Sequence, residues 1–540
     1  MGQGPSRPDW QHQETAHGTT NGILTGCDVL RAESFKRVQG CKVGLIANAT
    51  SVLRDLTHLA DAMHACATTN SPSPFQLVAI FGPEHGLRGT AQAGKSESAS
   101  KDPKTGLPIF DLYSKNPPAI AKCFEASGAD TIVFDIQDVG ARFYTFIWTL
   151  YDCLVAAALS SSVRRFLVLD RPNPLGGVVV DGPITEPQHA SFVGRKAIPL
   201  RHGMTVGELA RLFLSEFLPS DAHLSHVRAS GPVATSQTST RKSSSPTFSP
   251  PFKLEVVEMA GWTRSSFPFF PYPQPFLLPP ALPSPSTVSL SAPPPSPSVT
   301  PLPPPPPLPP SPSLTPLPVA NHQPSLSREA LPSPPTATPS TVSAILTSAA
   351  PAATVRTALQ PLLWVPPSPN MPTPVTALVY AGTCLVEGTN LSEGRGTTLP
   401  FQLIGAPFMD HRFAEAVRNQ LCPGCAIREA FFSPVAGKYS EKQVCGIEIH
   451  VTDPATFDPL RLALILLTTA RSLYPSDFHW RNDSPTNSPN GPFWIDKLAG
   501  SDSLRKGVDA GRSVDEIKVG WQPQLMWFSA IRSQYLLYTD

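Results

Sequence analysis

Phe75-Gln-Leu-Val-Ala-Ile-Phe81 leads directly into Gly82-Pro-Glu-His-Gly86, and two further apolar runs end in the same way. Thr131-Ile-Val-Phe134 leads into Asp135-Ile-Gln-Asp-Val-Gly-Ala-Arg142, and Phe166-Leu-Val-Leu169 into Asp170-Arg-Pro-Asn-Pro174. Continuous apolar runs indicate strands that are buried on both faces, as in a parallel sheet covered by helices. Ligands of such sheets bind beyond the carboxyl ends of the strands. The pattern therefore predicts a polar pocket formed by the side chains that follow these runs.

Helical patterns alternate with these strands along the first part of the chain. A fourth strand is expected over 42–46. The distribution of apolar residues predicts helices over 56–67, 119–127, 144–159 and 204–218. At the start of the last helix, Thr205 is suited to be the N-cap and Glu208 its capping-box partner. This alternation is typical of a doubly wound α/β domain, which we place at residues 22–228.

The rest of the chain divides by composition. Residues 1–21 are expected to be a disordered lead, 229–251 a Ser/Thr-rich insertion, and 252–267 a short return of globular sequence. Globular sequence resumes at residue 352 and continues over 352–540 as an α+β domain that completes the cleft. Within it, 375–385 and 446–451 are expected as strands, and 413–421, 460–473 and 527–538 as helices.

Residues 268–351 contain 29 of the chain's 65 prolines. Such a segment cannot form helices or a sheet ladder, so we expect a mobile, polyproline-like insertion. Its repeated Pro-x-x-Pro spacing suits SH3 or WW-type partner domains. A spacer, or translated intron sequence, explains the same composition, and we favour that interpretation because the spacing arises by chance in any such segment.

Charge and hydropathy exclude several classes of protein. A net charge of +1 over 540 residues provides no electrostatic field for nucleic acid or an anionic membrane. No apolar run reaches the ~18 residues of a membrane span. The N-terminus lacks the apolar core of a secretory signal, which favours a cytoplasmic protein. Gly2 lies in a loose N-myristoylation pattern, but a plain polar N-terminus is the simpler interpretation.

Nine cysteines spread over a long chain favour reduced thiols rather than a disulfide framework. Cys422 and Cys425 have the spacing of zinc ligands, but only Cys445 lies near them in the sequence, and a structural zinc site needs four ligands. We therefore expect a turn there, with no metal site.

Glu84 and His85 follow a buried strand and are flanked by glycines. A carboxyl group at the edge of a buried sheet is suited to act as a general acid, whereas capping the next helix or pairing with Arg88 are the structural alternatives. Asp138 and Arg142 have the spacing of a helical ion pair. The loop from Asp170 is rigid because of its prolines, and it suits either a turn or hydrogen bonding to sugar hydroxyls.

Several longer sequence motifs, spread over roughly residues 22–538, resemble those of the exo-β-N-acetylmuramidases of the NamZ family. The motifs are Gly82-Pro-Glu-His-Gly-Leu-Arg-Gly89, Phe134-Asp-Ile-Gln-Asp-Val-Gly-Ala-Arg-Phe-Tyr-Thr145, Leu169-Asp-Arg-Pro-Asn-Pro-Leu-Gly176, Arg201-His-Gly-Met-Thr205, Trp364-Val-Pro-Pro-Ser-Pro-Asn-Met-Pro372 and Glu387-Gly-Thr-Asn-Leu-Ser-Glu-Gly-Arg-Gly-Thr-Thr398. The resemblance implies a Rossmann-like N-terminal domain, a smaller C-terminal domain and a cleft between them. It also implies the release of terminal N-acetylmuramic acid from the non-reducing end of peptidoglycan fragments.

The resemblance implies that Glu84 is the catalytic acid, with Glu393, Asp135 or Asp138 as the second carboxylate. No metal or organic cofactor is needed for such chemistry. One of Arg171, Arg395 and Arg142 is expected to pair with the lactyl carboxylate of muramic acid. The full set of expected substrate-binding residues is His85, Asp135, Gln137, Arg142, Asp170, Arg171, Asn173, His202, Asn370, Asn390 and Arg395. The alternative is a catalytically inactive sugar-binding or scaffold protein that recruits partners through its Pro-rich arm.

Overall fold

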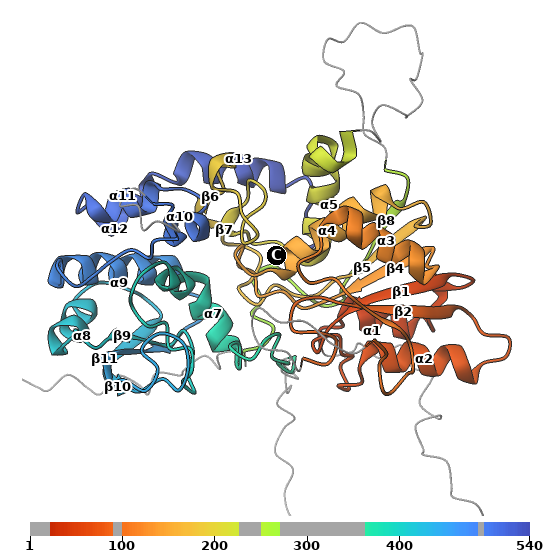
Figure 1. The fold of residues 1–540 in the computed structure, drawn as a ribbon, viewed down its shortest axis with the longest axis horizontal. Coiled ribbons are helices and arrows are strands. Elements are labelled where there is room, and N and C mark those ends of the chain that lie inside the picture. The colour runs from red at the N-terminus through yellow and green to blue at the C-terminus, as the bar shows by residue number, and fades with distance from the viewer. Residues whose placement is uncertain (1–21, 90–99, 226–249, 271–361, 484–490) are drawn as a thin grey trace, which may run out of the picture. The chain divides into compact units, whose positions relative to one another are not determined.

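The computed structural model describes residues 22–89, 100–225, 250–270, 362–483 and 491–540. Its N-terminal half contains a six-stranded sheet in the order β3-β2-β1-β4-β5-β8, in which all neighbouring strands are parallel (Figure 1). The strands are β1 (Lys42–Ala47), β2 (Gln76–Gly82), β3 (Ile109–Asp111), β4 (Thr131–Asp135), β5 (Arg165–Leu169) and β8 (Lys253–Val257). This is the strand order of a Rossmann-like domain, with its switch point between β1 and β4.

Helices cover both faces of this sheet, as the apolar strand sequences predict. Figure 1 shows α1 (Gly26–Ala32) and α2 (Leu59–Thr69) on one face, and α3 (Pro117–Ser127), α4 (Phe146–Leu159) and α5 (Val206–Leu212) on the other. Alternate residues of β4 accordingly enter different cores: Val133 packs beneath α1 and α2, whereas Ile132 and Phe134 pack on the α3–α4 side. The predicted α/β fold is confirmed, and so is the capping box of Thr205 and Glu208 at the start of α5.

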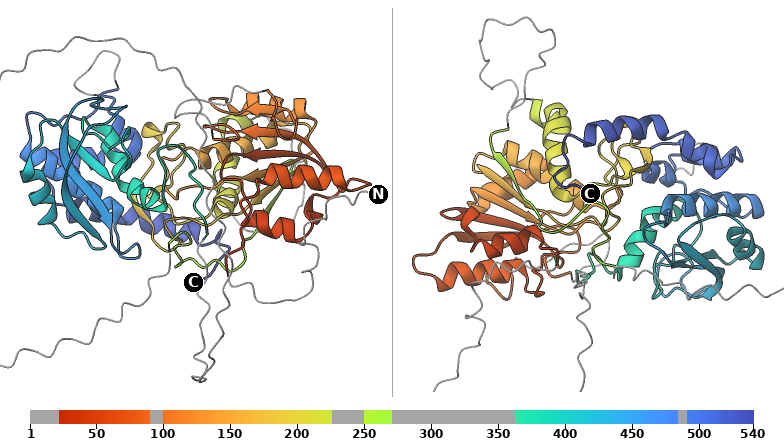
Figure 2. Two further views of the ribbon diagram at one scale, coloured as in Figure 1. Left: turned by 90° about the horizontal axis from the view of Figure 1, so that it is seen from below. Right: turned by 180° about the vertical axis from the view of Figure 1, so that it is seen from behind.

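The C-terminal half, drawn in green to blue in Figure 2, contains an antiparallel sheet in the order β10-β11-β9. Its strands are β9 (Leu403–Ala406), β10 (Cys425–Phe432) and β11 (Val444–Val451). Its helices are α7 (Pro374–Thr383), α8 (His411–Arg418), α9 (Pro459–Leu473), α10 (Trp494–Ala499), α11 (Ser503–Asp509), α12 (Val514–Val519) and α13 (Gln522–Arg532). The expected second domain of mixed helix and strand is therefore present.

The strand expected over 375–385 is wrong, because this stretch forms helix α7 instead. Thr373 caps the helix by accepting a hydrogen bond from the backbone N–H of Thr376, and Pro374 occupies the first turn, where its missing N–H costs nothing. The rest of α7 is buried nearly all round. A helix without a polar face has the same apolar pattern as a buried strand, so only its capping residues could have distinguished the two.

Several expected segments lie outside the described residues. They are the lead at 1–21 with its myristoylation pattern, most of 229–251, and the Pro-rich insertion apart from its first three residues. The return segment at 252–267 supplies β8, the sixth strand of the parallel sheet. Within the described ranges, no helix combines the length and the apolar character that crossing a membrane requires.

One continuous apolar core includes residues of both halves. Tyr380 of α7 contacts the rings of Phe143 and Tyr144, with ring centroids 5.0 and 5.8 Å apart. Beside this cluster, the fully buried Arg142 donates hydrogen bonds to the carbonyl oxygens of Pro183, Ile198 and Leu498. Leu498 belongs to α10, so the Arg142 guanidinium joins the N-terminal sheet domain to the C-terminal half.

Asp170 makes a second connection of this kind. Its carboxylate, which has no solvent exposure, accepts hydrogen bonds from the Thr205 hydroxyl (2.7 Å), the Gly207 N–H (2.8 Å) and the hydroxyl of Tyr538 (2.6 Å). The side chain therefore ties the end of β5 to the start of α5 and to the C-terminal segment. Burial raises the pKa of Asp170 to about 7, although these hydrogen bonds oppose the shift.

The raised pKa predicts a pH-dependent effect of Asp170→Asn on stability. Because the folded protein holds the proton of Asp170 more tightly than the unfolded chain does, this group's contribution to stability is full below its unfolded pKa of about 4 and declines as pH rises through about 7. The amide keeps the size of the side chain but does not titrate. We expect the melting temperature of Asp170→Asn, relative to wild type, to rise between about pH 5 and pH 8. A difference that is the same at both pH values would contradict this assignment.

Candidate active site

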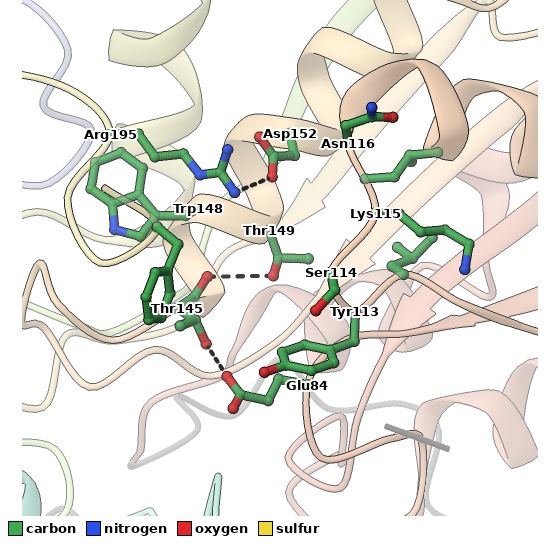
Figure 3. A pocket seen from close by; sticks show the side chains of 13 residues that line it. Glu84, Tyr113, Ser114, Lys115, Asn116, Thr145, Trp148, Thr149, Asp152 and Arg195 are labelled. Atoms are coloured by element: carbon green, nitrogen blue, oxygen red, sulfur yellow. Dashed lines mark hydrogen bonds and ion pairs between the residues drawn. The ribbon is translucent and has the colours of Figure 1, made fainter. Parts of the chain in front are cut away.

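Glu84 lies in a sharply turned loop directly after β2. His85 has a φ of 72°, a left-handed conformation that is uncommon for residues other than glycine, and the N–H of Gly86 donates to the Pro83 carbonyl. The hydroxyl of Thr145, immediately before α4, donates a 2.8 Å hydrogen bond to Glu84 Oε2 (Figure 3). The loop and the start of α4 together hold the Glu84 carboxylate in one place.

Two cavities meet at Glu84. The larger, of about 480 Å³, is formed by the N-terminal half and extends from Glu84 along α4 to Asp152 and Arg195 (Figure 3). The smaller, of about 180 Å³, is lined by residues of both halves. Glu84, Thr145 and Phe192 line both cavities. A substrate that spans the two cavities therefore passes over the Glu84 carboxylate.

The smaller cavity brings together four of the expected site residues: Glu84, His85, Asn370 and Arg395. Its walls also include Tyr144, whose pKa is raised by burial and raised further by the nearby carboxylates of Asp138 and Glu84. The Tyr144 hydroxyl therefore stays protonated and can donate a hydrogen bond to a ligand. Loops from both halves of the chain thus converge on one polar pocket.

Arg395 provides the positive charge of this cavity. Its guanidinium donates to Glu387 Oε1 (2.7 Å), lies 3.5 Å from Glu393 and covers the ring of Phe401. Burial lowers the pKa of Arg395, but the Glu387 carboxylate more than offsets this and raises the pKa above its usual range. Glu393 does not line either cavity; it is buried behind Arg395 and pairs with Lys438 at 3.1 Å.

Asp138 lines neither cavity and is 5% exposed. Its Oδ2 accepts a hydrogen bond from the N–H of Gly140 (2.6 Å) and lies 3.8 Å from His202 Nε2. Asp138 Oδ1 and His202 Nε2 are both buried and have no hydrogen-bond partner among the residues that the structure describes. Buried polar atoms of this kind usually have a partner, so a ligand or water is expected to complete the pair.

The remaining expected residues form hydrogen bonds and ion pairs within the loops that carry them. Asp135 and Arg171 form a bidentate ion pair with distances of 2.6 and 2.9 Å, and both are nearly inaccessible to solvent. Gln137 donates to the carbonyls of Asp138 and Pro172. The structure therefore places these three side chains among protein partners rather than at either of the two cavities around Glu84.

Two asparagines also act within loops. Asn173 accepts from the N–H of Leu175 and donates to the Met204 carbonyl. It packs against Gly140, where a Cβ would lie 2.1 Å from Asn173 Oδ1 and where the φ of 81° favours glycine. Asn390 bonds to the backbone of Asp477 and His479. With Arg142 and Asp170, these residues support the site without lining the cavities at Glu84.

Apart from Glu84, the residues that line the larger cavity were not among the expected site residues. They are Leu112, Tyr113, Ser114, Lys115, Asn116, Ile120, Thr145, Trp148, Thr149, Asp152, Phe192 and Arg195. Thr145, Thr149 and Asp152 recur at helical spacing along α4, which was a usable signal for a shared face. The loop that carries Phe192 and Arg195 has no comparable pattern. Among the described residues, no group of three or more His, Cys, Asp or Glu side chains is placed to hold a metal ion.

Comparisons with known proteins agree with this architecture. The family description exo-β-N-acetylmuramidase NamZ matches in two parts, an N-terminal domain over residues 43–290 and a C-terminal domain over 378–538. The peptidoglycan β-N-acetylmuramidase NamZ of Bacillus subtilis (strain 168) is 33% identical over 517 residues, which cover 96% of this chain and 91% of that protein.

Two crystal structures of DUF1343 family proteins from Bacteroides fragilis NCTC 9343 share the fold. They superpose with TM-scores of 0.63 and 0.56, each at 24% identity, and the matches cover 97% and 96% of this chain and 100% and 99% of theirs. The order of the sequence motifs, the two-part architecture and the family match over most of the chain lead to one conclusion. This protein belongs to the exo-β-N-acetylmuramidase NamZ family.

Proposed function

We propose that this protein is a glycoside hydrolase that releases terminal N-acetylmuramic acid from the non-reducing end of peptidoglycan fragments, with Glu84 as the general acid. The family and the Bacillus subtilis relative support hydrolysis of peptidoglycan. The observation that carries the proposal is the position of Glu84 at the junction of two cavities, held there by Thr145. A glycosidic bond at this junction receives its proton from Glu84 as it breaks.

The two cavities differ in a way that suits exo action. The smaller one is bounded by the aromatic cluster of Tyr144, Tyr380 and Phe401, and its volume of about 180 Å³ leaves little room beyond a terminal sugar. The larger one continues along α4. We therefore assign the terminal muramic acid to the smaller cavity and the remainder of the substrate to the larger one.

Arg395 is the residue that we assign to the lactyl carboxylate of muramic acid. Of the three arginines expected for this role, Arg142 and Arg171 are buried and engaged with carbonyl and carboxylate groups of the protein. Arg395 lines the smaller cavity and its side chain keeps 29% of its exposure. A guanidinium binds a carboxylate through paired, charge-assisted hydrogen bonds.

For the second carboxylate we favour Asp138 over Glu393. Glu393 is flanked by Arg395 and Lys438, which neutralise it, and Asp135 is paired with Arg171. Among the described residues, Asp138 forms no ion pair with a lysine or arginine, and it acts electrostatically on Tyr144 at the cavity wall. A carboxylate that is not neutralised by such a partner stabilises the positive charge that develops on the sugar ring as the bond breaks.

Glu84→Gln tests the general acid. The amide keeps the size of the side chain and its bond with Thr145 but cannot deliver a proton, so kcat on a muramic acid disaccharide should fall by roughly 10²–10⁴. The loss should be smaller on a nitrophenyl glycoside, whose leaving group needs little protonation. Equal losses on both substrates would move the acid role to another carboxylate. A wild type that is inactive on every muramic acid glycoside would favour the sugar-binding or scaffold alternative.

Arg395→Gln tests recognition of the lactyl group. Wild type should prefer a chromogenic muramic acid glycoside over its lactyl amide analogue, because only the former carries a carboxylate. The variant should lose roughly 10–100-fold in kcat/KM on the acid and much less on the amide. Arg412→Gln, which removes an exposed arginine paired with Asp410, is the matched control and should change neither value. Retained preference for the acid in Arg395→Gln would refute the assignment.

A further inference from the structure

The larger cavity contains a charged pair that the proposed chemistry at Glu84 does not use. Arg195 and Asp152 form an ion pair of 2.9 Å at the far end of the cavity (Figure 3). Asp152 is 5% exposed, and its second oxygen, Oδ1, is buried without a hydrogen-bond partner in the part of the chain that the structure describes. The same holds for Arg195 Nε. A buried acceptor and a buried donor beside a cavity are positioned to bind a polar ligand.

The spacing along α4 separates this pair from the Thr145–Glu84 contact. Thr145, which bonds Glu84, and Asp152 are seven residues apart, roughly 10 Å along a helix that rises about 1.5 Å per residue. Asp152 therefore lies about two helical turns beyond the Thr145–Glu84 contact, in the direction in which the larger cavity extends.

The walls of the cavity suit an uncharged sugar. Its lining charges are Glu84, Asp152, Lys115 and Arg195, which balance one another. Phe192, whose exposed fraction is 57%, stands at the end nearest Glu84 and contacts the ring of Trp494. An exposed aromatic ring there can pack against the face of a pyranose, while Asp152 and Arg195 are placed to hydrogen-bond its hydroxyl and amide groups.

The larger cavity continues past the Asp152–Arg195 ion pair. Asp152 and Arg195 also line an adjoining open cavity of about 270 Å³, together with Tyr151 and Lys196. A ligand that reaches the pair therefore has a path beyond it. This is the geometry that a polymeric leaving group needs, and it contrasts with the small cavity on the other side of Glu84.

We propose that the larger cavity is the leaving-group subsite, in which Asp152 and Arg195 hydrogen-bond the neutral N-acetylated sugar that is joined to the terminal muramic acid. This assignment rests on the proposed glycosidase function. Asp152 accepts a hydrogen bond from a hydroxyl or amide N–H of that sugar, and Arg195 donates to a hydroxyl or carbonyl oxygen. Both act as positioning residues, because they bind the leaving group and leave the proton transfer to Glu84.

The test compares two substrates that share the muramic acid and differ in the leaving group. One is the disaccharide of N-acetylmuramic acid linked to N-acetylglucosamine, and the other is N-acetylmuramyl fluoride, whose leaving group is a single atom. Arg195→Gln and Asp152→Asn should each raise KM for the disaccharide by roughly tenfold or more. The loss of kcat/KM on the fluoride should be at least several-fold smaller. Arg195→Lys, which retains the charge, should recover part of the loss.

Controls separate this assignment from the function on which it rests. A wild type inactive on both substrates overturns the glycosidase proposal and the subsite with it. A wild type active on both, with variants that lose equally on the two substrates or on neither, overturns the subsite alone. Arg412→Gln should behave as wild type on both. If Asp152→Asn does not fold, Arg195→Gln and Arg195→Lys decide the question, because the Arg195 side chain is 36% exposed and its replacement leaves no cavity in the core.

Discussion

The six parallel strands of the N-terminal sheet all end at the same edge of the sheet. The charged loops that follow these strands therefore lie close together in a small, largely buried volume. Burying a charge without a partner is costly, so most of these groups are paired with one another. The Asp135–Arg171 ion pair and the hydrogen-bonded Asp170 are the clearest examples. The rigidity of the site comes from these internal pairs, and only a few polar groups are left to face a ligand.

Glu84 lines both cavities at this edge of the sheet. Its position depends on the turn after β2 and on Thr145, which lies at the end of the loop after β4. The second half of the molecule then completes the pocket, because α7 and the loop carrying Arg395 close the smaller cavity against Tyr144. Arg142 holds this arrangement together through carbonyl acceptors on both sides of the junction. The candidate site is therefore a product of the contact between the two halves, and neither half contains it alone.

Buried polar atoms without partners are informative in such a structure, because proteins seldom leave them unmatched. In the described ranges they include Asp138 Oδ1, His202 Nε2, Glu393 Oε2 and Asp152 Oδ1. Asp152 lines the larger cavity, and Asp138 acts electrostatically on Tyr144 at the wall of the smaller one. Under the proposed function, these two carboxylates are therefore candidates for contact with the sugars on either side of the bond to be cleaved.

The sequence by itself determined the parallel sheet, the alternating helices and the loop in which Glu84 lies, because burial on both faces of a strand and capping at Thr205 are written in local residue patterns. It also identified the family, through motifs that recur in order. It did not distinguish the buried helix α7 from a strand, since both are apolar throughout. Only the tertiary structure decided which polar side chains line the two cavities at Glu84: Asp170, Arg171 and Asn173 look like ligand-binding residues in the sequence, yet each is engaged with protein partners away from those two cavities. Phe192 carries no local signal, and the helical spacing of Asp152 with Thr145 and Thr149 indicates a shared helix face but not a cavity beside it. Their roles depend on which distant segments pack beside them, and that is set by the whole core rather than by neighbouring residues.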